Sequence, residues 1–185
     1  MTSLQPLAPP LQVSRWFNTA VPIDLYSLRG RVVIVECFQM LCPGCVSHGL
    51  PQAARIHDGF NADTVAVIGL HTVFEHHDAM QPHALEVYLN EYGISFPVGV
   101  DTPGENTDLP RTMQAYQIGG TPTLILIDKQ GRRRAQYLGA VADLRLGAEI
   151  SALCLEDPND PLTSGPIGMP AARRDGTDRQ TTSAG

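Results

Sequence analysis

The chain of 185 residues has few cysteines, no excess of positive charge and no long hydrophobic run. Four cysteines are too few for a scaffold held together by disulfides. The net charge of −6 offers no electrostatic footprint for nucleic acid or an anionic membrane. No apolar run is long enough to span a bilayer, and the N-terminus lacks the basic and apolar regions of a signal peptide. We therefore expect a cytoplasmic protein without nucleic-acid or membrane partners.

Composition divides the chain into three parts. Residues 1–14 carry three prolines and little periodicity, so we expect an extended arm. Residues 15–156 alternate apolar runs with amphipathic segments and are long enough for one domain with a core. Residues 157–185 are rich in Pro, Gly, Asp, Arg, Thr and Ser. Their apolar content is too low to offset the entropy cost of ordering, which predicts a flexible tail.

Apolar, β-branched runs predict the strands, and periodic segments bounded by Gly or Pro predict the helices. Strands are expected at 31–37, 64–70, 96–100, 122–128 and 132–139, and helices at 43–57, 80–92, 110–116 and 141–155. A short edge strand and a turn are expected over 22–30. This order indicates an α/β fold in which a mixed sheet carries helices on both faces.

A pair of cysteines lies where a strand passes into a helix, in Cys42-Pro43-Gly44-Cys45. Residues 32–35 have the composition of a buried strand. Pro43 fits the first turn of a helix, where its missing N–H costs nothing. The start of a helix aims backbone N–H groups and a positive dipole end at Cys42, and both stabilise a reactive thiolate.

Metal binding is an alternative interpretation, because a Cys-x-x-Cys pair can be half of a zinc site. The remaining cysteines, Cys37 and Cys154, form no second pair. Four histidines lie within thirteen residues of sequence, at His71, His76, His77 and His83. A metal-binding module would combine this cluster with Cys42 and Cys45, although the histidine spacing matches no standard ligand pattern. No other cofactor is indicated.

Four features together resemble the thioredoxin superfamily, within it the TlpA-like and redoxin-like thiol-disulfide oxidoreductases. Two are the cysteine pair between strand and helix and Thr121-Pro122 before an apolar strand. The others are Leu126–Gly131, similar to the family's strand-turn-strand ending, and an extra strand-helix segment around residues 64–100. Together they cover about residues 15–155. The resemblance implies a thioredoxin-like fold with a strand-helix insertion.

The chain departs from the family pattern in several places. Leu41 stands where the family usually has a tryptophan before the first cysteine, which changes the surface beside the thiol. Pro51 lies nine residues after Cys42, whereas the family's helix proline usually lies eight after it. Val35 and Gln39 occupy the positions of the peroxiredoxin Pro and Thr/Ser, which argues against peroxidase chemistry. TlpA-like members are usually exported, yet no export signal is visible here.

The resemblance and the helix position together suggest roles for three residues. Cys42 is expected to attack a partner disulfide, and Cys45, one turn further on, to resolve the mixed disulfide. Glu36 matches the position of the buried acid that accepts a proton in thioredoxins. The alternative is that Glu36 ends its strand and points to water, since side chains alternate along a strand and the register is unknown.

Substrate contacts are expected on both sides of the thiols. In the family, the proline corresponding to Pro122 is cis and faces the cysteine pair, so Thr121 and Pro122 would offer backbone for strand-like pairing with a peptide. Pro43 and Gly44, between the thiols, are expected to belong to the same surface. A trans proline that opens a strand is the alternative.

The expected function is thiol-disulfide exchange, mainly as a reductant. The partners would be a disulfide-containing protein or a small thiol, together with an unidentified electron donor. A redox-inert interaction domain on the same frame is a further alternative. Cys37 is expected to be a buried apolar residue or a third redox thiol, and Cys154 to be a packing residue. His48 lies at the surface or favours the thiolate through its charge.

Overall fold

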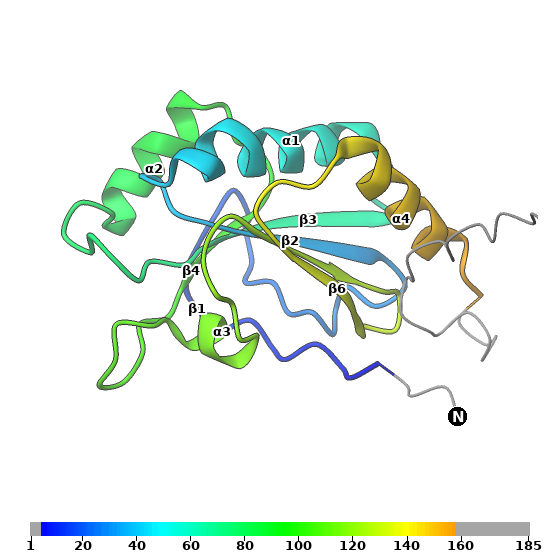
Figure 1. Cartoon of the computed structure of the whole chain (residues 1–185), viewed down its shortest axis with the longest axis horizontal. Helices are drawn as coiled ribbons and strands as arrows, with labels where there is room; N and C mark the ends of the chain where they lie inside the picture. The colour runs from blue at the N-terminus through cyan, green and yellow to red at the C-terminus, as the bar shows by residue number, and fades with distance from the viewer. Residues whose placement is uncertain (1–4, 158–185) are drawn as a thin grey trace, which may run out of the picture.

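A computed structural model describes residues 5–157 of the chain (Figure 1). Its elements in order are β1 (Val13–Phe17), β2 (Val32–Phe38), the π-helical turn η1 (Cys45–Gly49), α1 (Leu50–Gly59), β3 (Val65–His71), α2 (Pro82–Glu91), β4 (Val98–Asp101), α3 (Arg111–Ala115), β5 (Thr123–Ile127), β6 (Arg133–Leu138) and α4 (Asp143–Leu155). The expected central strands and helices are all present. No helix of the described part combines the length and apolarity needed to cross a membrane.

One six-stranded sheet, in the order β1-β4-β3-β2-β5-β6, organises the fold. Strand β2 lies at its centre, parallel to β3 and antiparallel to β5. Helices α1, α2 and α4 cover one face, while α3 and the segment 22–30 cover the other (Figure 1). The expected mixed sheet with helices on both faces is confirmed. The segment over 64–100 supplies β3, α2 and β4, as the expected insertion does.

The residues of β2 alternate between the two cores. Ile34 and Phe38 lie in the core beneath α1, α2 and α4. Val35 and Cys37 lie in the core on the opposite face. Because side chains alternate along a strand, Glu36 shares the face of Ile34 and Phe38 and points toward the helix that carries the cysteine pair. Only 1% of Glu36 is exposed, so the alternative that it points to water is wrong.

The edge strand lies earlier in the chain than expected. Strand β1 pairs with β4, in antiparallel fashion, and begins at Val13, inside the segment expected as an arm. The segment 22–30, where an edge strand was expected, consists of turns. Asp24 closes the first of them, because its carboxylate accepts the Tyr26 N–H at 3.0 Å and its carbonyl accepts the Ser27 N–H.

The two ends of the described chain lie against the β5–β6 hairpin or close to it. Leu7 bridges to Arg132, and the Ala8 N–H donates to the Gly131 carbonyl at 2.9 Å. At the other end, the Arg134 guanidinium is buried and pairs with Asp128 and with Glu156, just beyond α4. Apart from Asp157, the tail expected over 157–185 lies outside the described residues.

The helix after the cysteine pair is not a continuous α-helix. Its first turn is the π-helical η1, in which the Leu50 N–H donates to the carbonyl of Cys45 five residues earlier. Pro51 then falls in the first turn of α1, where a backbone N–H is not needed. The wider π turn accommodates one additional residue between Cys42 and Pro51, which explains the nine-residue spacing.

Candidate active site

Cys42 is the more accessible cysteine of the pair. It is half-buried and follows the C-terminal end of β2. The backbone N–H of Cys45 donates to the Cys42 Sγ at 3.2 Å. The Cys42 thiol donates to the carbonyl of Thr121 at 3.4 Å. An N–H aimed at the sulfur stabilises negative charge there, as expected for the start of a helix. Cys42 is therefore both accessible and poised to act as a nucleophile.

Cys45 lies one turn further along the helix and is fully buried. Burial and the hydrogen-bonded neighbour Cys42 raise the pKa of the Cys45 thiol well above its ordinary value. Both sulfurs are free thiols in this structure. The pair thus combines one accessible sulfur with one shielded sulfur, which needs a proton acceptor before it can attack.

The loop before β5 faces the thiols. The peptide bond between Thr121 and Pro122 is cis. Pro122 packs closely against the start of the helix, because a Cβ built on Gly44 would lie 3.1 Å from the proline Cδ. The structure brings Thr121 and Pro122 beside Cys42 although almost 80 residues separate them in the sequence.

A groove of about 450 Å³ opens beside Cys42. One wall is the loop that follows β3, which contributes Phe74, Glu75 and His76. The opposite wall is the backbone of residues 119–121. The remaining lining residues are Leu41, Cys42, Pro43 and Ala79. His76 belongs to the histidine cluster that the sequence singled out, whereas Phe74 and Glu75 gave no sign in the sequence that they would line the groove.

Glu36 lies beneath this site rather than in the groove. Its Oε1 is buried and has no hydrogen-bond partner within residues 5–157. Burial without compensation raises the pKa of the Glu36 carboxyl from 4.5 to about 8. The carboxyl lies against Gly49 and near Pro122, since a Cβ built on Gly49 would overlap Glu36 Oε1 and lie 2.9 Å from Pro122 Cβ. Gly49 lies four residues after Cys45, and residues at this spacing share a helix face. This spacing is the sequence signal that could have identified Gly49 as part of the site.

A Gly49→Ala substitution is expected to destabilise the protein by about 1–3 kcal/mol, because the added methyl overlaps the Glu36 carboxyl and crowds Pro122. Unfolding in urea at pH 7 measures the change. Gly59→Ala is the matched control, since a Cβ at this helical glycine meets nothing within 4 Å. Equal stability of the two variants would contradict the described contact between Glu36 and Gly49.

The histidine cluster is dispersed, and of its four members His76 alone lines the groove beside Cys42. His71 is fully buried at the end of β3, where burial lowers its pKa to about 4 and neither ring nitrogen has a hydrogen-bond partner within the described residues. His76, His77 and His83 are exposed. Among residues 5–157, no three His, Cys, Asp or Glu side chains are placed to hold a metal ion. The structure therefore gives the metal-binding alternative no ligand set.

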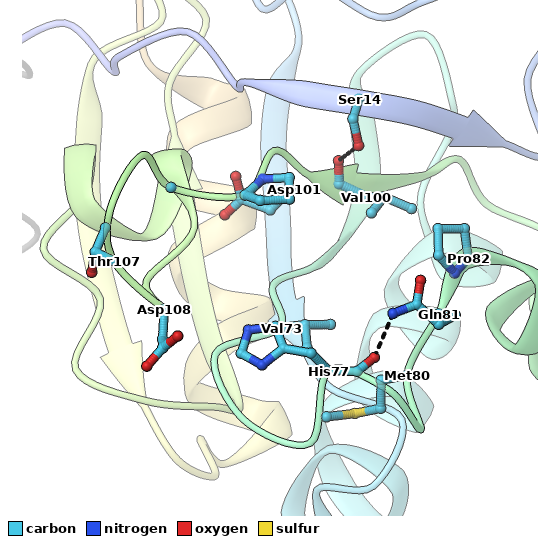
Figure 2. A pocket seen from close by; sticks show the side chains of 12 residues that line it. Ser14, Val73, His77, Met80, Gln81, Pro82, Val100, Asp101, Thr107 and Asp108 are labelled. Atoms are coloured by element: carbon cyan, nitrogen blue, oxygen red, sulfur yellow. Dashed lines mark hydrogen bonds between the residues drawn. The ribbon is translucent and has the colours of Figure 1, made fainter.

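A second hollow, of about 350 Å³, lies at the edge of the sheet and includes neither thiol. Its lining residues include His77, Met80 and Asp101 (Figure 2). The Asp101 carboxylate is already satisfied, because the Thr72 hydroxyl and the N–H groups of Thr112 and Met113 donate to it. Within the described part of the chain, no cysteine lines this hollow, so it is separate from the site at Cys42.

No family model matches the chain, whereas solved structures and curated proteins do. A crystal structure of a thioredoxin-like superfamily protein is 55% identical, with a TM-score of 0.80 over 84% of this chain and 99% of that one. A thiol-disulfide isomerase from Corynebacterium glutamicum is 50% identical, with a TM-score of 0.79 over 83% of this chain and 98% of that one.

Two curated relatives are more distant. The thiol-disulfide oxidoreductase ResA of Bacillus anthracis is 28% identical over 118 residues, which are 63% of this chain and 60% of ResA. The protein DipZ of Mycobacterium tuberculosis is 33% identical over 97 residues, which are 51% of this chain and 14% of DipZ. The chain thus spans less than two thirds of either curated relative. From its fold and from the two solved structures at half identity or more, the chain belongs to the thioredoxin-like superfamily of thiol-disulfide oxidoreductases.

Proposed function

We propose that the protein reduces disulfides through the Cys42–Cys45 pair. The observation that carries this proposal is the arrangement of the two sulfurs: the accessible Cys42 Sγ accepts the N–H of Cys45, whose own sulfur is buried one turn deeper. An accessible, stabilised thiolate suits nucleophilic attack, and a shielded second thiol suits resolution. The family described above supports the same chemistry.

The reaction balances in two exchange steps. The Cys42 thiolate attacks one sulfur of a partner disulfide, forms a mixed disulfide and releases the other partner sulfur as a thiolate. Cys45 then loses its proton and attacks the Cys42 sulfur, which releases the second partner sulfur. The partner gains two electrons, and the protein is left with a Cys42–Cys45 disulfide. Glu36 is the proton acceptor that we propose for the second step, since a carboxyl whose pKa is about 8 can take up and release a proton near neutral pH.

The groove favours a partner that can lie extended beside the thiol. Its wall at residues 119–121 is backbone, which suits strand-like pairing with a peptide, and its rim includes the exposed Leu41 in place of an aromatic residue. We propose a disulfide-containing protein as the substrate. The alternative substrate is the disulfide form of a small-molecule thiol. A separate donor must then return two electrons. In the cytoplasm, our proposed location, the pool of reduced thiols could supply them.

A redox titration of the full chain tests this function. We expect one two-electron transition at about −220 mV or lower, because a reductant must be able to give up electrons in a compartment held by glutathione at about −220 to −260 mV. A transition above about −180 mV would indicate an oxidant instead. If the Cys42–Cys45 pair did not oxidise at any of these potentials, the protein would be a redox-inert interaction domain.

A Cys45→Ser variant is expected to accumulate mixed disulfides with partners, because Cys42 still attacks but nothing resolves the product. Non-reducing gels and mass spectrometry of the trapped species identify the partners and the attached cysteine. The double variant Cys42→Ser/Cys45→Ser is the control and should trap none. Trapping through Cys37 or Cys154 in that control would show that the proposed nucleophile is wrong.

A further inference from the structure

A small cavity lies behind Glu36, on the side away from the substrate groove. Its volume is about 80 Å³. The lining comes from β2, η1, α1, the start of β5 and the segment that leads into α4, and consists of Glu36, His48, Gly49, Gln52, Arg55, Leu124, Gly139, Ala140, Val141 and Asp143. Because His48, Arg55, Ala140 and Asp143 are exposed, the cavity reaches solvent on their side.

One side of this cavity is formed by the Glu36 carboxyl, one oxygen of which lacks a hydrogen-bond partner among the described residues. Glu36 is almost completely buried, and its Oε1 accepts no hydrogen bond from any described residue. A buried carboxyl oxygen without a partner is costly unless water satisfies it. One water needs roughly 10–15 Å³ of such volume and two or more polar partners, so this polar cavity has room for several. The site is therefore built to hold water against Glu36.

The other side of the carboxyl leads toward the thiols. Gly49 lies four residues after Cys45, so both belong to one side of the helical turn, and both are buried. The missing side chain of Gly49 is what makes room for the carboxyl, since a Cβ there would overlap Glu36 Oε1. Glu36 thus lies against Gly49, which belongs to the same turn η1 as the buried Cys45, and both Glu36 and Gly49 line the cavity.

We propose that this cavity is a proton passage, in which a short chain of waters carries the proton that Cys45 gives to Glu36 out to solvent beside His48. The inference rests on the proposed function and deepens it. As Cys45 attacks the Cys42 sulfur, its proton passes to the Glu36 carboxylate. Glu36 then releases that proton to the adjacent water, and the chain delivers it to the imidazole of His48 or to bulk water. When the protein is reduced again, a proton enters from solvent along the same path and returns to Cys45.

The charged groups around the passage fit this role. His48 faces it from η1, Arg55 from α1 and Asp143 from α4, while β5 contributes only the apolar Leu124. Arg55 and Asp143 pair at 3.1 Å, so their charges offset each other at the mouth. His48 is the imidazole at the mouth, and an imidazole can both accept and donate a proton.

Proton exchange at Glu36 can be measured without any turnover. The C=O stretch of the protonated carboxyl is followed by infrared spectroscopy after rapid mixing of the full chain with D2O. Ala140→Phe narrows the mouth, and His48→Leu removes the titratable group. We expect each substitution to slow exchange at Glu36 by about tenfold or more. His83→Leu is the matched control, because His83 is an exposed histidine on α2 that does not line the cavity.

Single-turnover kinetics provide the second readout. In both variants the resolving step should slow near pH 7, while the first attack by Cys42 stays unchanged. Added imidazole should restore the rate in His48→Leu, where the path is open, but not in Ala140→Phe. Unchanged infrared exchange and resolution in both folded variants would overturn the proposal. Failure of the proposed function looks different, because the unmodified protein would then show no disulfide exchange while proton exchange at Glu36 could still be read.

Discussion

Replacement of Cys42 by alanine is expected to abolish disulfide exchange, with a loss of about a thousandfold or more in rate. Cys42 is half-buried rather than buried, its sulfur accepts the Cys45 N–H, and it lines the groove beside the proline loop. No other thiol can replace it there, because Cys45 and Cys37 are fully buried. The loss of rate is measured by mixing the reduced variant with a protein disulfide and monitoring the reduction of that disulfide by fluorescence.

The matched control is Cys154→Ala. Cys154 lies in α4, far along the chain from the pair, and it packs against the edge of the core. Its removal should leave the exchange rate within about twofold of that of the unmodified protein, since Cys154 does not line the groove. A large loss in Cys154→Ala combined with activity in Cys42→Ala would refute the assignment of the nucleophile.

The second large effect concerns stability and pH at Glu36. Burial raises the pKa of this carboxyl from 4.5 to about 8 in the folded protein. Below pH 4.5 Glu36 is protonated in both the folded and the unfolded chain, so its ionisation does not lower the stability of the folded state. Between pH 4.5 and about 8 only the unfolded chain releases it, so the folded state loses stability as pH rises. Above pH 8 the penalty is complete.

A Glu36→Gln variant removes this titration and should therefore gain stability relative to the unmodified protein as pH rises. The pKa of Glu36 differs by about 3.5 between the folded and unfolded chain, and each pKa unit corresponds to about 1.4 kcal/mol. The gain in free energy of unfolding between pH 4 and pH 9 therefore has an upper limit of about 5 kcal/mol. Urea unfolding of both proteins at several pH values measures it. Burying the glutamine amide in Glu36→Gln adds a free-energy cost that does not vary with pH. This cost cancels, because only the change in stability with pH is compared.

The exposed carboxyl Glu75 supplies the control. The pH-dependent gain in stability of Glu36→Gln should exceed any gain of Glu75→Gln, because Glu36 is buried and Glu75 is exposed. His71 also titrates with a lowered pKa, but it is present in every variant and cancels in the comparison. A pH-independent difference between Glu36→Gln and the unmodified protein would mean that Glu36 is not held in a desolvated site.

The elements that the sequence predicted best were the ones with the clearest hydrophobic signal. The apolar runs of β2, β3 and β5 and the cysteine pair after β2 were all predicted near their observed positions. The side toward which Glu36 points could not be predicted, because every residue of β2 is buried and no apolar–polar alternation marks its two faces. Its register is set by pairing with β3 and β5, where Glu36 lies opposite Gly69 and Leu124.

The features that escaped prediction depend on contacts between distant segments. The π turn leaves Pro51 in the first turn of α1, and the nine-residue spacing in the sequence did not show this turn. Strand β1 is short and half polar, and its partner β4 lies more than 80 residues away. The histidines looked like a cluster, yet His71 ends a buried strand while His76 and His77 follow in a loop.

The antiparallel pairing of β2 with β5 has a consequence for how the protein is made. Thr123 lies opposite Cys37, so the loop before β5 arrives beside the thiols only when β5 joins the sheet. A chain still on the ribosome, synthesised as far as α3, already carries both sulfurs but not the wall of residues 119–121. During synthesis both sulfurs of the pair therefore leave the ribosome before the segment that forms the opposite wall of the groove.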